Sequence, residues 1–231
     1  MNKNISFHHF NEKQKLHEQL SNTLVSKIEK IIEDDDRVLI AFSGGSTPKP
    51  LFEKLSHMNL AWEKVYVTLV DERWVDNTHN DSNEKLIKKH LLKNKATKAK
   101  FIPLKLDTAS PFEGTKKCAK QFENIKADID IVILGMGTDA HTASFFPKDE
   151  NLHNALDTKE MFAATIPTDA PHQRITFSLS KLLKAKDIFL HIEGKNKLEV
   201  YNEASKEGDI KKMPIRAFLY NEKPLKVYYA D

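Results

Sequence analysis

The stretch Asp130-Ile131-Val132-Ile133-Leu134-Gly135-Met136-Gly137-Thr138-Asp139-Ala140-His141 decides how this chain folds. It starts with a short, continuous and mostly β-branched apolar run, which is typical of a strand buried on both faces of a parallel sheet. The two glycines that follow permit a tight turn and let backbone N–H groups approach a ligand closely. Ligands of open α/β sheets bind beyond the carboxyl ends of the strands. The stretch therefore predicts a central strand that ends in a ligand-binding turn.

The end of this stretch predicts a helix that begins near Asp139 or Ala140, with Thr138 or Asp139 as its cap. His141 would then lie in the first helical turn. A helix N-terminus disfavours an imidazolium, so we expect His141 to be neutral near pH 7 and able to accept a proton. The alternative interpretation is that His141 only packs against the helix or caps it.

The same residues also match the dinucleotide-binding pattern G-x-G-x-x-A, at Gly135, Gly137 and Ala140. That pattern requires a long helix after the turn. Pro147 follows too soon for such a helix, because proline is poorly tolerated inside one. A site for a small substrate is therefore a better interpretation than a nicotinamide site.

Outward from this stretch, hydrophobic periodicity alternates between helical and strand patterns. The expected helices cover residues 10–32, 48–56, 82–92, 111–126 and 195–206. The expected strands cover residues 37–42, 65–70, 101–104, 130–134, 161–166, 174–179, 187–192, 215–220 and 226–229. This alternation predicts an α/β fold with a mostly parallel, Rossmann-like open sheet and helices on both faces. Since no composition break or repeat is visible, we expect a single domain over residues 1–231.

Composition excludes several kinds of partner. The 231 residues carry a net charge of only +3, without the clustered basic residues that nucleic-acid binding requires. No apolar run is long enough to span a membrane or to serve as a signal core. The only cysteine, Cys118, cannot form a disulfide within the chain, which suits a reducing compartment. We therefore expect a cytoplasmic protein with neither nucleic acid nor a membrane as partner.

Polar residues follow several of the predicted strands, and the ends of parallel strands meet at one edge of a sheet. Ser43 to Thr47 could cradle a phosphate, because its glycines expose N–H groups and a helix N-terminus follows. Asp71 to Arg73 ends the next strand and is either part of a site or a surface ion pair. Lys195 and Lys197 begin a helix, where they oppose the helix dipole unless an anion binds. Arg174 begins its strand and joins this edge only if that strand runs antiparallel.

Several familiar catalytic patterns are absent from the sequence. The spacing of the Ser43 to Thr47 stretch is not that of a P-loop. There is no H-E-x-x-H, paired-cysteine or facial His/carboxylate spacing, so no metal is expected. There is no G-x-S-x-G elbow, which argues against a serine hydrolase.

Taken together, the motifs resemble the 6-phosphogluconolactonase family, which shares its fold with the glucosamine-6-phosphate deaminases. The matching stretches, in the family's order, are Ser43-Gly44-Gly45-Ser46-Thr47-Pro48, Asp71-Glu72-Arg73, residues 135–147, Pro171-x-x-Arg174 and Gly194-Lys195. The chain follows the lactonase version at Arg73, where the deaminases usually have tyrosine, and again after His141. It departs from the family at Ala140, where glycine is usual. A positive φ there would cost alanine about 1 kcal/mol.

The resemblance implies hydrolysis of 6-phospho-D-glucono-1,5-lactone to 6-phosphogluconate in the oxidative pentose phosphate pathway, with no metal or organic cofactor. It implies that His141 is the general base that activates water and that Arg73 contacts the substrate and stabilises the oxyanion. The candidate substrate- and phosphate-binding residues are Ser43, Gly44, Gly45, Ser46, Thr47, Asp71, Arg174 and Lys195. The part played by Asp71 within this set stays open, as does that of Asp139. The alternatives are a sugar-phosphate isomerase or deaminase of the same fold, and a non-catalytic sugar-phosphate-binding regulator that would not need His141.

Overall fold

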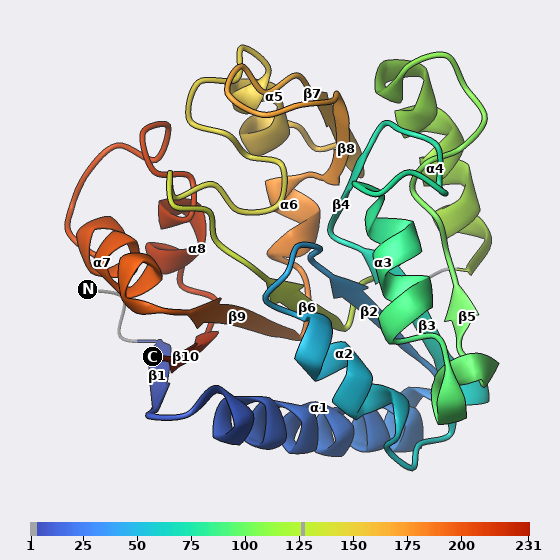
Figure 1. The fold of residues 1–231 in the computed structure, drawn as a ribbon. Coiled ribbons are helices and arrows are strands. Elements are labelled where there is room, and N and C mark those ends of the chain that lie inside the picture. Colours follow the sequence, from blue (N-terminus) through green and yellow to red (C-terminus); the bar gives the residue numbers. More distant parts are fainter. Residues whose placement is uncertain (1–3, 126–127) are drawn as a thin grey trace.

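The computed structural model describes residues 4–125 and 128–231, and their strands form two sheets (Figure 1). The large sheet is parallel throughout. Its seven strands are, in spatial order, β1 (Ile5–Phe10), β10 (Leu225–Ala230), β9 (Asp187–Glu193), β6 (Ile131–Leu134), β2 (Val38–Phe42), β3 (Val65–Leu69) and β5 (Lys100–Phe101). The small sheet is antiparallel and consists of β4 (Asp71–Arg73), β8 (Arg174–Phe177) and β7 (Phe162–Thr165). The predicted α/β class with a mostly parallel sheet is confirmed.

The order of the strands in the large sheet reverses between β2 and β6. From β2 the chain continues to β3 and β5 on one side, and from β6 it continues to β9 and β10 on the other. The loops that leave β2 and β6 lie side by side, because Ser43 N donates to Ile133 O at 2.9 Å and Gly135 N donates to Ser43 Oγ at 3.2 Å. Such a reversal opens a crevice at the carboxyl ends of the strands, where ligands of doubly wound folds bind.

Helices surround the large sheet, and α1 (Lys13–Asp35) and α2 (Lys49–Ser56) pack against each other along its lower part in Figure 1. In α1, Leu16, Leu20 and Leu24 are fully buried at a spacing of four, as the periodicity predicted. The remaining helices are α3 (Asn83–His90), α4 (Pro111–Ile125), α5 (Leu152–Asp157), α6 (Leu179–Leu182), α7 (Lys195–Ala204) and α8 (Arg216–Leu219), with 3-10 turns at η1 (Trp62–Lys64) and η2 (Asn94–Lys98). The helix predicted for residues 111–126 corresponds to α4, although Lys126 lies outside the described residues.

Two elements at the edges differ from the sequence predictions. The edge strand β1 was missed, because most of its side chains are exposed and give no apolar pattern. The predicted helix of residues 10–32 consequently begins later, at Lys13. The strands predicted at residues 161–166 and 174–179 exist as β7 and β8, but they pair in the small sheet with β4 instead of extending the parallel one.

Two predicted elements are wrong. Residues 215–220 are not a strand, because Arg216–Leu219 forms α8, and burial of all four residues hides the periodicity that distinguishes a helix from a strand. No helix begins at Asp139. Ala140 and Ala143 have φ values of 64° and 50°, which a right-handed helix cannot accommodate. His141 therefore lies in a loop, and the expectation that a helix dipole keeps it neutral no longer applies.

Within residues 4–125 and 128–231, every helix falls short of the length or the apolar character needed to cross a membrane.

Candidate active site

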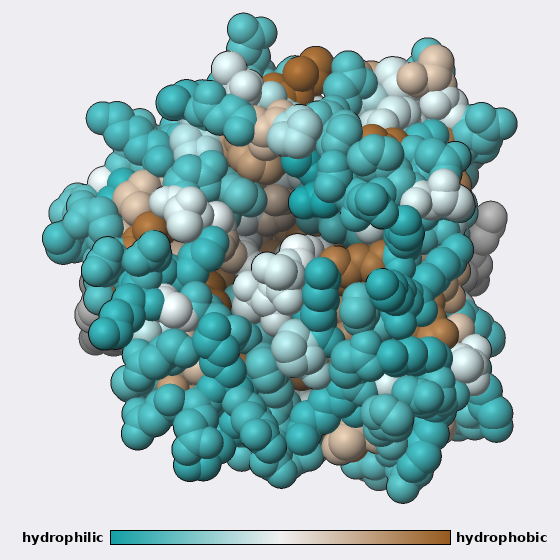
Figure 2. Space-filling view, in the orientation of Figure 1, coloured by the Kyte–Doolittle hydropathy of each residue, from teal (hydrophilic) through white to brown (hydrophobic). Residues whose placement is uncertain are grey.

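A pocket of about 270 Å³ opens at the carboxyl ends of β2, β6 and β9. On the face shown in Figure 2, a hollow lies near the centre, with hydrophilic surface around it. The described lining consists of residues 43–48, 133–137, 141–143 and 191–193, with Asp71, Arg73, Asn83 and Lys197. The pocket thus lies where the strand order reverses, and it collects most of the candidate residues.

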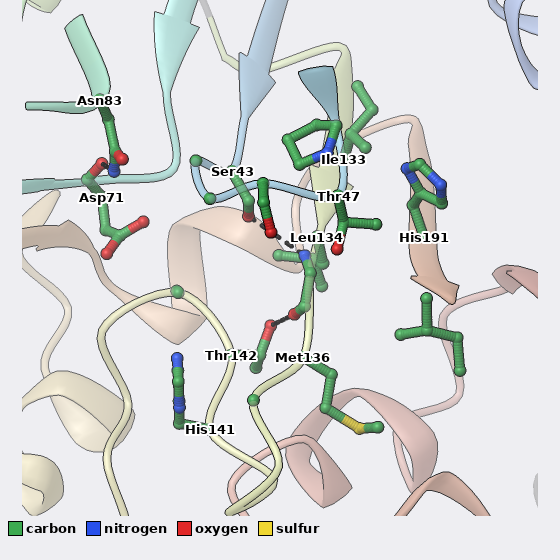
Figure 3. Close-up of a pocket in the computed structure, with 18 of the residues that line it drawn as sticks. Ser43, Thr47, Asp71, Asn83, Ile133, Leu134, Met136, His141, Thr142 and His191 are labelled. Atoms are coloured by element: carbon green, nitrogen blue, oxygen red, sulfur yellow. Dashed lines mark hydrogen bonds between the residues drawn. The ribbon is translucent and has the colours of Figure 1, made fainter. Parts of the chain in front are cut away.

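His141 and Asp139 form a hydrogen-bonded pair at this pocket. Asp139 Oδ1 accepts hydrogen bonds from His141 Nδ1 at 2.6 Å and from the His141 backbone N–H at 3.1 Å. Because Nδ1 carries the proton and donates it in the hydrogen bond to Asp139, Nε2 of the neutral imidazole has the free lone pair and can accept a proton. The ring stacks on Phe146 with centroids 4.2 Å apart, and in Figure 3 it points toward the space between Asp71 and the loop that contains Ser43.

The ionisation of Asp139 supports this arrangement. Burial alone would raise the pKa of the carboxyl, but the hydrogen bonds and the charge of His141 outweigh burial and hold the pKa below its ordinary value. Thr138 or Asp139 was expected to cap a helix, and the part played by Asp139 in the site was left open. Asp139 instead orients the imidazole, as the carboxylate does in other histidine–carboxylate pairs.

Gly137 is required by the same pair. A Cβ at this position would lie 2.1 Å from His141 Nδ1 and 2.3 Å from Asp139 Oδ1. Gly137 also closes the turn, because its N–H donates to His141 O at 2.8 Å. The second glycine of the motif therefore leaves room for the imidazole–carboxylate contact.

The loop from Ser43 to Thr47 forms the opposite wall of the pocket (Figure 3). Gly45 has a φ of 95° and no atom within 4 Å of a Cβ built there, so it needs glycine for its backbone conformation and leaves open space. A Cβ on Gly44 would overlap the Asn83 side chain at 1.8 Å. Asn83 Nδ2 in turn donates to Asp71 O at 2.9 Å, which connects this loop to β4. Asn83 carries no motif that would have revealed it from the sequence.

Residues Asp71 to Arg73 have three different environments. The Asp71 side chain lines the pocket and accepts a hydrogen bond from Ser144 Oγ at 2.6 Å. Arg73 also lines the pocket, and its Nη1 donates to Asp81 O at 2.5 Å. Glu72 is buried at the N-terminus of α3, where it accepts the N–H groups of Asn83 and Glu84. It is therefore not part of the pocket wall and is not a simple surface ion-pair residue, although burial raises its pKa to about 7.

Arg174 lies close to this group but outside the pocket lining. Strand β8 is antiparallel to β4 and pairs Arg174 with Arg73, so the condition for its joining this edge is met. The side chain is buried, its Nε has no hydrogen-bond partner among the described residues, and its guanidinium lies 5.7 Å from the Phe146 ring. Burial lowers its pKa, while the charge of Asp71 opposes that shift. Arg174 is thus a buried positive charge near the pocket that does not form part of its lining.

The two lysines at the start of α7 are placed differently from the expectation. Lys195 is exposed and does not line the pocket. Lys197 lines it, and its ammonium donates to Met136 O. Burial lowers the pKa of Lys197, and the charge of Asp139 opposes this shift. The resemblance implied that Lys195 supplies a positive charge to the pocket. In the structure Lys197, two residues further along α7, is the lysine that lines the pocket.

Comparisons with known proteins agree with these features. The model of the family described as glucosamine-6-phosphate isomerases/6-phosphogluconolactonase matches residues 11–227. A 6-phosphogluconolactonase from Rhizobium meliloti is 40% identical over 228 residues, covering 97% of this chain and 98% of that protein. One from Helicobacter pylori is 37% identical and covers 93% of both chains. The crystal structure of a 6-phosphogluconolactonase from Shewanella baltica superposes with a TM-score of 0.97 at 40% identity over the full length of both chains.

The doubly wound sheet, the pocket at its switch point and these matches define a protein of the sugar-phosphate isomerase and lactonase class. The chain belongs to the glucosamine-6-phosphate isomerase/6-phosphogluconolactonase family. The resemblance inferred from the motifs is confirmed. These relatives are 6-phosphogluconolactonases and not deaminases.

Proposed function

We propose that this chain hydrolyses 6-phospho-D-glucono-1,5-lactone to 6-phosphogluconate, a step of the oxidative pentose phosphate pathway. The observation that carries the proposal is the Asp139–His141 pair at the pocket, opposite a loop rich in glycine and hydroxyl groups. Relatives that match over nearly the full chain bear the name of this lactonase, which supports the same substrate.

The phosphate of the substrate is assigned to the Ser43 to Thr47 loop and Lys197. The loop exposes backbone N–H groups at the N-terminus of α2, and such positions favour anions. Lys197 adds a positive charge from the neighbouring wall. Arg174, which lies outside the lining, strengthens the positive potential without a direct contact.

His141 is assigned the proton transfers. Its Nε2 takes a proton from water while the water oxygen forms a bond to the lactone carbonyl carbon. When the tetrahedral intermediate collapses, the bond between that carbon and the ring oxygen breaks, and the imidazolium returns the proton to the departing oxygen. Asp139 stabilises the imidazolium between these two steps, because its carboxylate accepts the Nδ1 proton throughout.

Arg73 is assigned to the negative charge that builds on the carbonyl oxygen during attack. Arg73 is part of the pocket lining, and its guanidinium is oriented by the hydrogen bond from Nη1 to Asp81 O. A donor that is fixed before the reaction stabilises an oxyanion more effectively than mobile water does.

The test is hydrolysis of the lactone measured above its spontaneous rate, with and without a metal chelator. We expect an enzymatic rate that the chelator does not change, since the proposed chemistry uses side chains alone. A rate equal to the spontaneous one would refute the proposal, and ammonia released from glucosamine 6-phosphate would favour a deaminase. The cytoplasmic location, the single domain and the absence of nucleic-acid and membrane partners stay predictions.

A further inference from the structure

A second group of titratable side chains lies at the wall between the pocket and helix α1. His191 and Glu193 are two residues apart on β9, so their side chains lie on one face of the sheet. That face meets α1, which carries His17. Nε2 of His17 lies 2.7 Å from Glu193 Oε1, and Nε2 of His191 lies 3.0 Å from the same oxygen.

All three side chains are largely withdrawn from solvent. The exposed fractions of the His17, His191 and Glu193 side chains are 9%, 2% and 11%. Nδ1 of His191 is buried and has no hydrogen-bond partner among the described residues, so hydrogen bonding does not account fully for this imidazole.

We propose that His17, His191 and Glu193 form a binding site for a divalent transition-metal ion of the zinc type. Their candidate ligand atoms all lie within 4.8 Å of one another. Two imidazole nitrogens and one carboxylate oxygen are a zinc donor set, with a water molecule as the fourth ligand. Tetrahedral bonds of about 2.0–2.2 Å separate ligand atoms by roughly 3.3 Å, a separation that lies between the two carboxylate–imidazole contacts of 2.7 and 3.0 Å and the 4.8 Å limit of the cluster.

The charges at the cluster fit a cation. Burial lowers the pKa of His191, which keeps a lone pair available for a metal. Burial would raise the pKa of Glu193, but the hydrogen bonds of the two histidines hold it well below its ordinary value. Lys13 lies 3.3 Å from the other carboxylate oxygen, Oε2, and its side chain is 54% exposed, so it can remain there or move into solvent.

An entry route and a structural consequence follow from the position. His17 and Glu193 line a second surface cavity beside α1, while His191 and Glu193 also line the catalytic pocket. A bound ion would join α1 to the end of β9, and it would do so apart from the His141–Asp139 pair. The inference is independent of the proposed catalytic chemistry.

The experiment uses the full chain without a polyhistidine tag, stripped of metal with a chelator that is then removed. Zn²⁺ is titrated against a chromophoric competitor, and Co²⁺ is added separately to observe the absorption of a tetrahedral site. The test variants are Glu193→Gln and His17→Gln. The matched control is the double variant His79→Gln/His172→Gln, because His79, Asp81 and His172 form the other described cluster that could hold an ion.

We expect wild type and the control to bind one Zn²⁺ with equal affinity, and each test variant to bind at least about tenfold more weakly. Zn²⁺ should also raise the melting temperature of wild type and the control but not of the test variants, because it binds only the folded state. Circular dichroism without metal establishes that each variant folds. If Zn²⁺ binds wild type no more tightly than either folded test variant, or if only the control loses affinity, the proposed site is wrong.

Discussion

Replacement of Asp139 by asparagine tests the imidazole–carboxylate pair directly, because the side chain keeps its shape and loses its charge. Hydrogen bonds to charged groups contribute about 1.5–3 kcal/mol. The Asp139 side chain is 46% exposed, and solvent screening places its contribution at the lower end, about 1.5–2 kcal/mol. A barrier increase of that size lowers kcat by about tenfold to thirtyfold. KM should change little, since Asp139 touches the histidine and not the substrate phosphate.

The assay is a pH–rate profile of lactone hydrolysis, corrected for the spontaneous reaction. Loss of the carboxylate removes a stabiliser of the imidazolium, so the acid limb of kcat/KM should move to lower pH. In a His141→Asn background the Asp139→Asn substitution should lower kcat much less than in wild type, because the effect of Asp139 on proton transfer runs through the imidazole. A single variant with kcat within threefold of wild type, or an equal loss in both backgrounds, would refute the pair as the proton-transfer unit.

Three further predictions concern Lys197, Gly137 and Cys118. Lys197→Ala should raise KM by about tenfold or more with a smaller change in kcat, whereas Lys195→Ala should match wild type, and steady-state kinetics of the two variants compares them. Gly137→Ala should lower kcat at least about a hundredfold while circular dichroism shows a folded protein, because the added Cβ lies 2.1 Å from His141 Nδ1. Burial raises the pKa of the Cys118 thiol to about 12, above the ordinary value of 9.0, so the stability that depends on it is present below pH 9 and falls toward pH 12. A thiol reagent at pH 8 should therefore modify Cys118 only in denaturant, and rapid reaction of the native protein would contradict this.

The main sheet could be predicted because its central strands satisfy a local rule. Ile131 to Leu134 and Val38 to Phe42 are apolar throughout since both faces are covered, and the sequence shows that directly. Strand β1 obeys no such rule, because an edge strand with exposed side chains is defined by its backbone pairing with β10. The small sheet was missed for a related reason, since periodicity identifies a strand but not its partner.

The site was predictable where a motif fixes the backbone and less so where only tertiary packing does. Ser43 to Thr47 and His141 were identified because glycine patterns mark turns at strand ends. Lys197 was passed over in favour of Lys195, because the direction of a side chain at the start of a helix depends on how that helix packs on β9. The meeting of His17 with Glu193 has no sequence signal at all, since 176 positions separate the two residues.

The two wrong elements are connected by a hydrogen bond. Ile215 N donates to Ala140 O at 3.0 Å, so the start of α8 is tied to the loop that carries His141. Ala140 is fully buried with a φ of 64°, which costs about 1 kcal/mol, and burial of its methyl group returns roughly 0.8 kcal/mol. This contact between two segments far apart in the sequence has no signal in either local pattern. The left-handed turn places the side chains of Asp139 and His141 on the same side of the loop. In a helix, residues two positions apart point in nearly opposite directions, so the two side chains would not have met. The loop conformation, and not a helix dipole, therefore makes the imidazole available to the pocket.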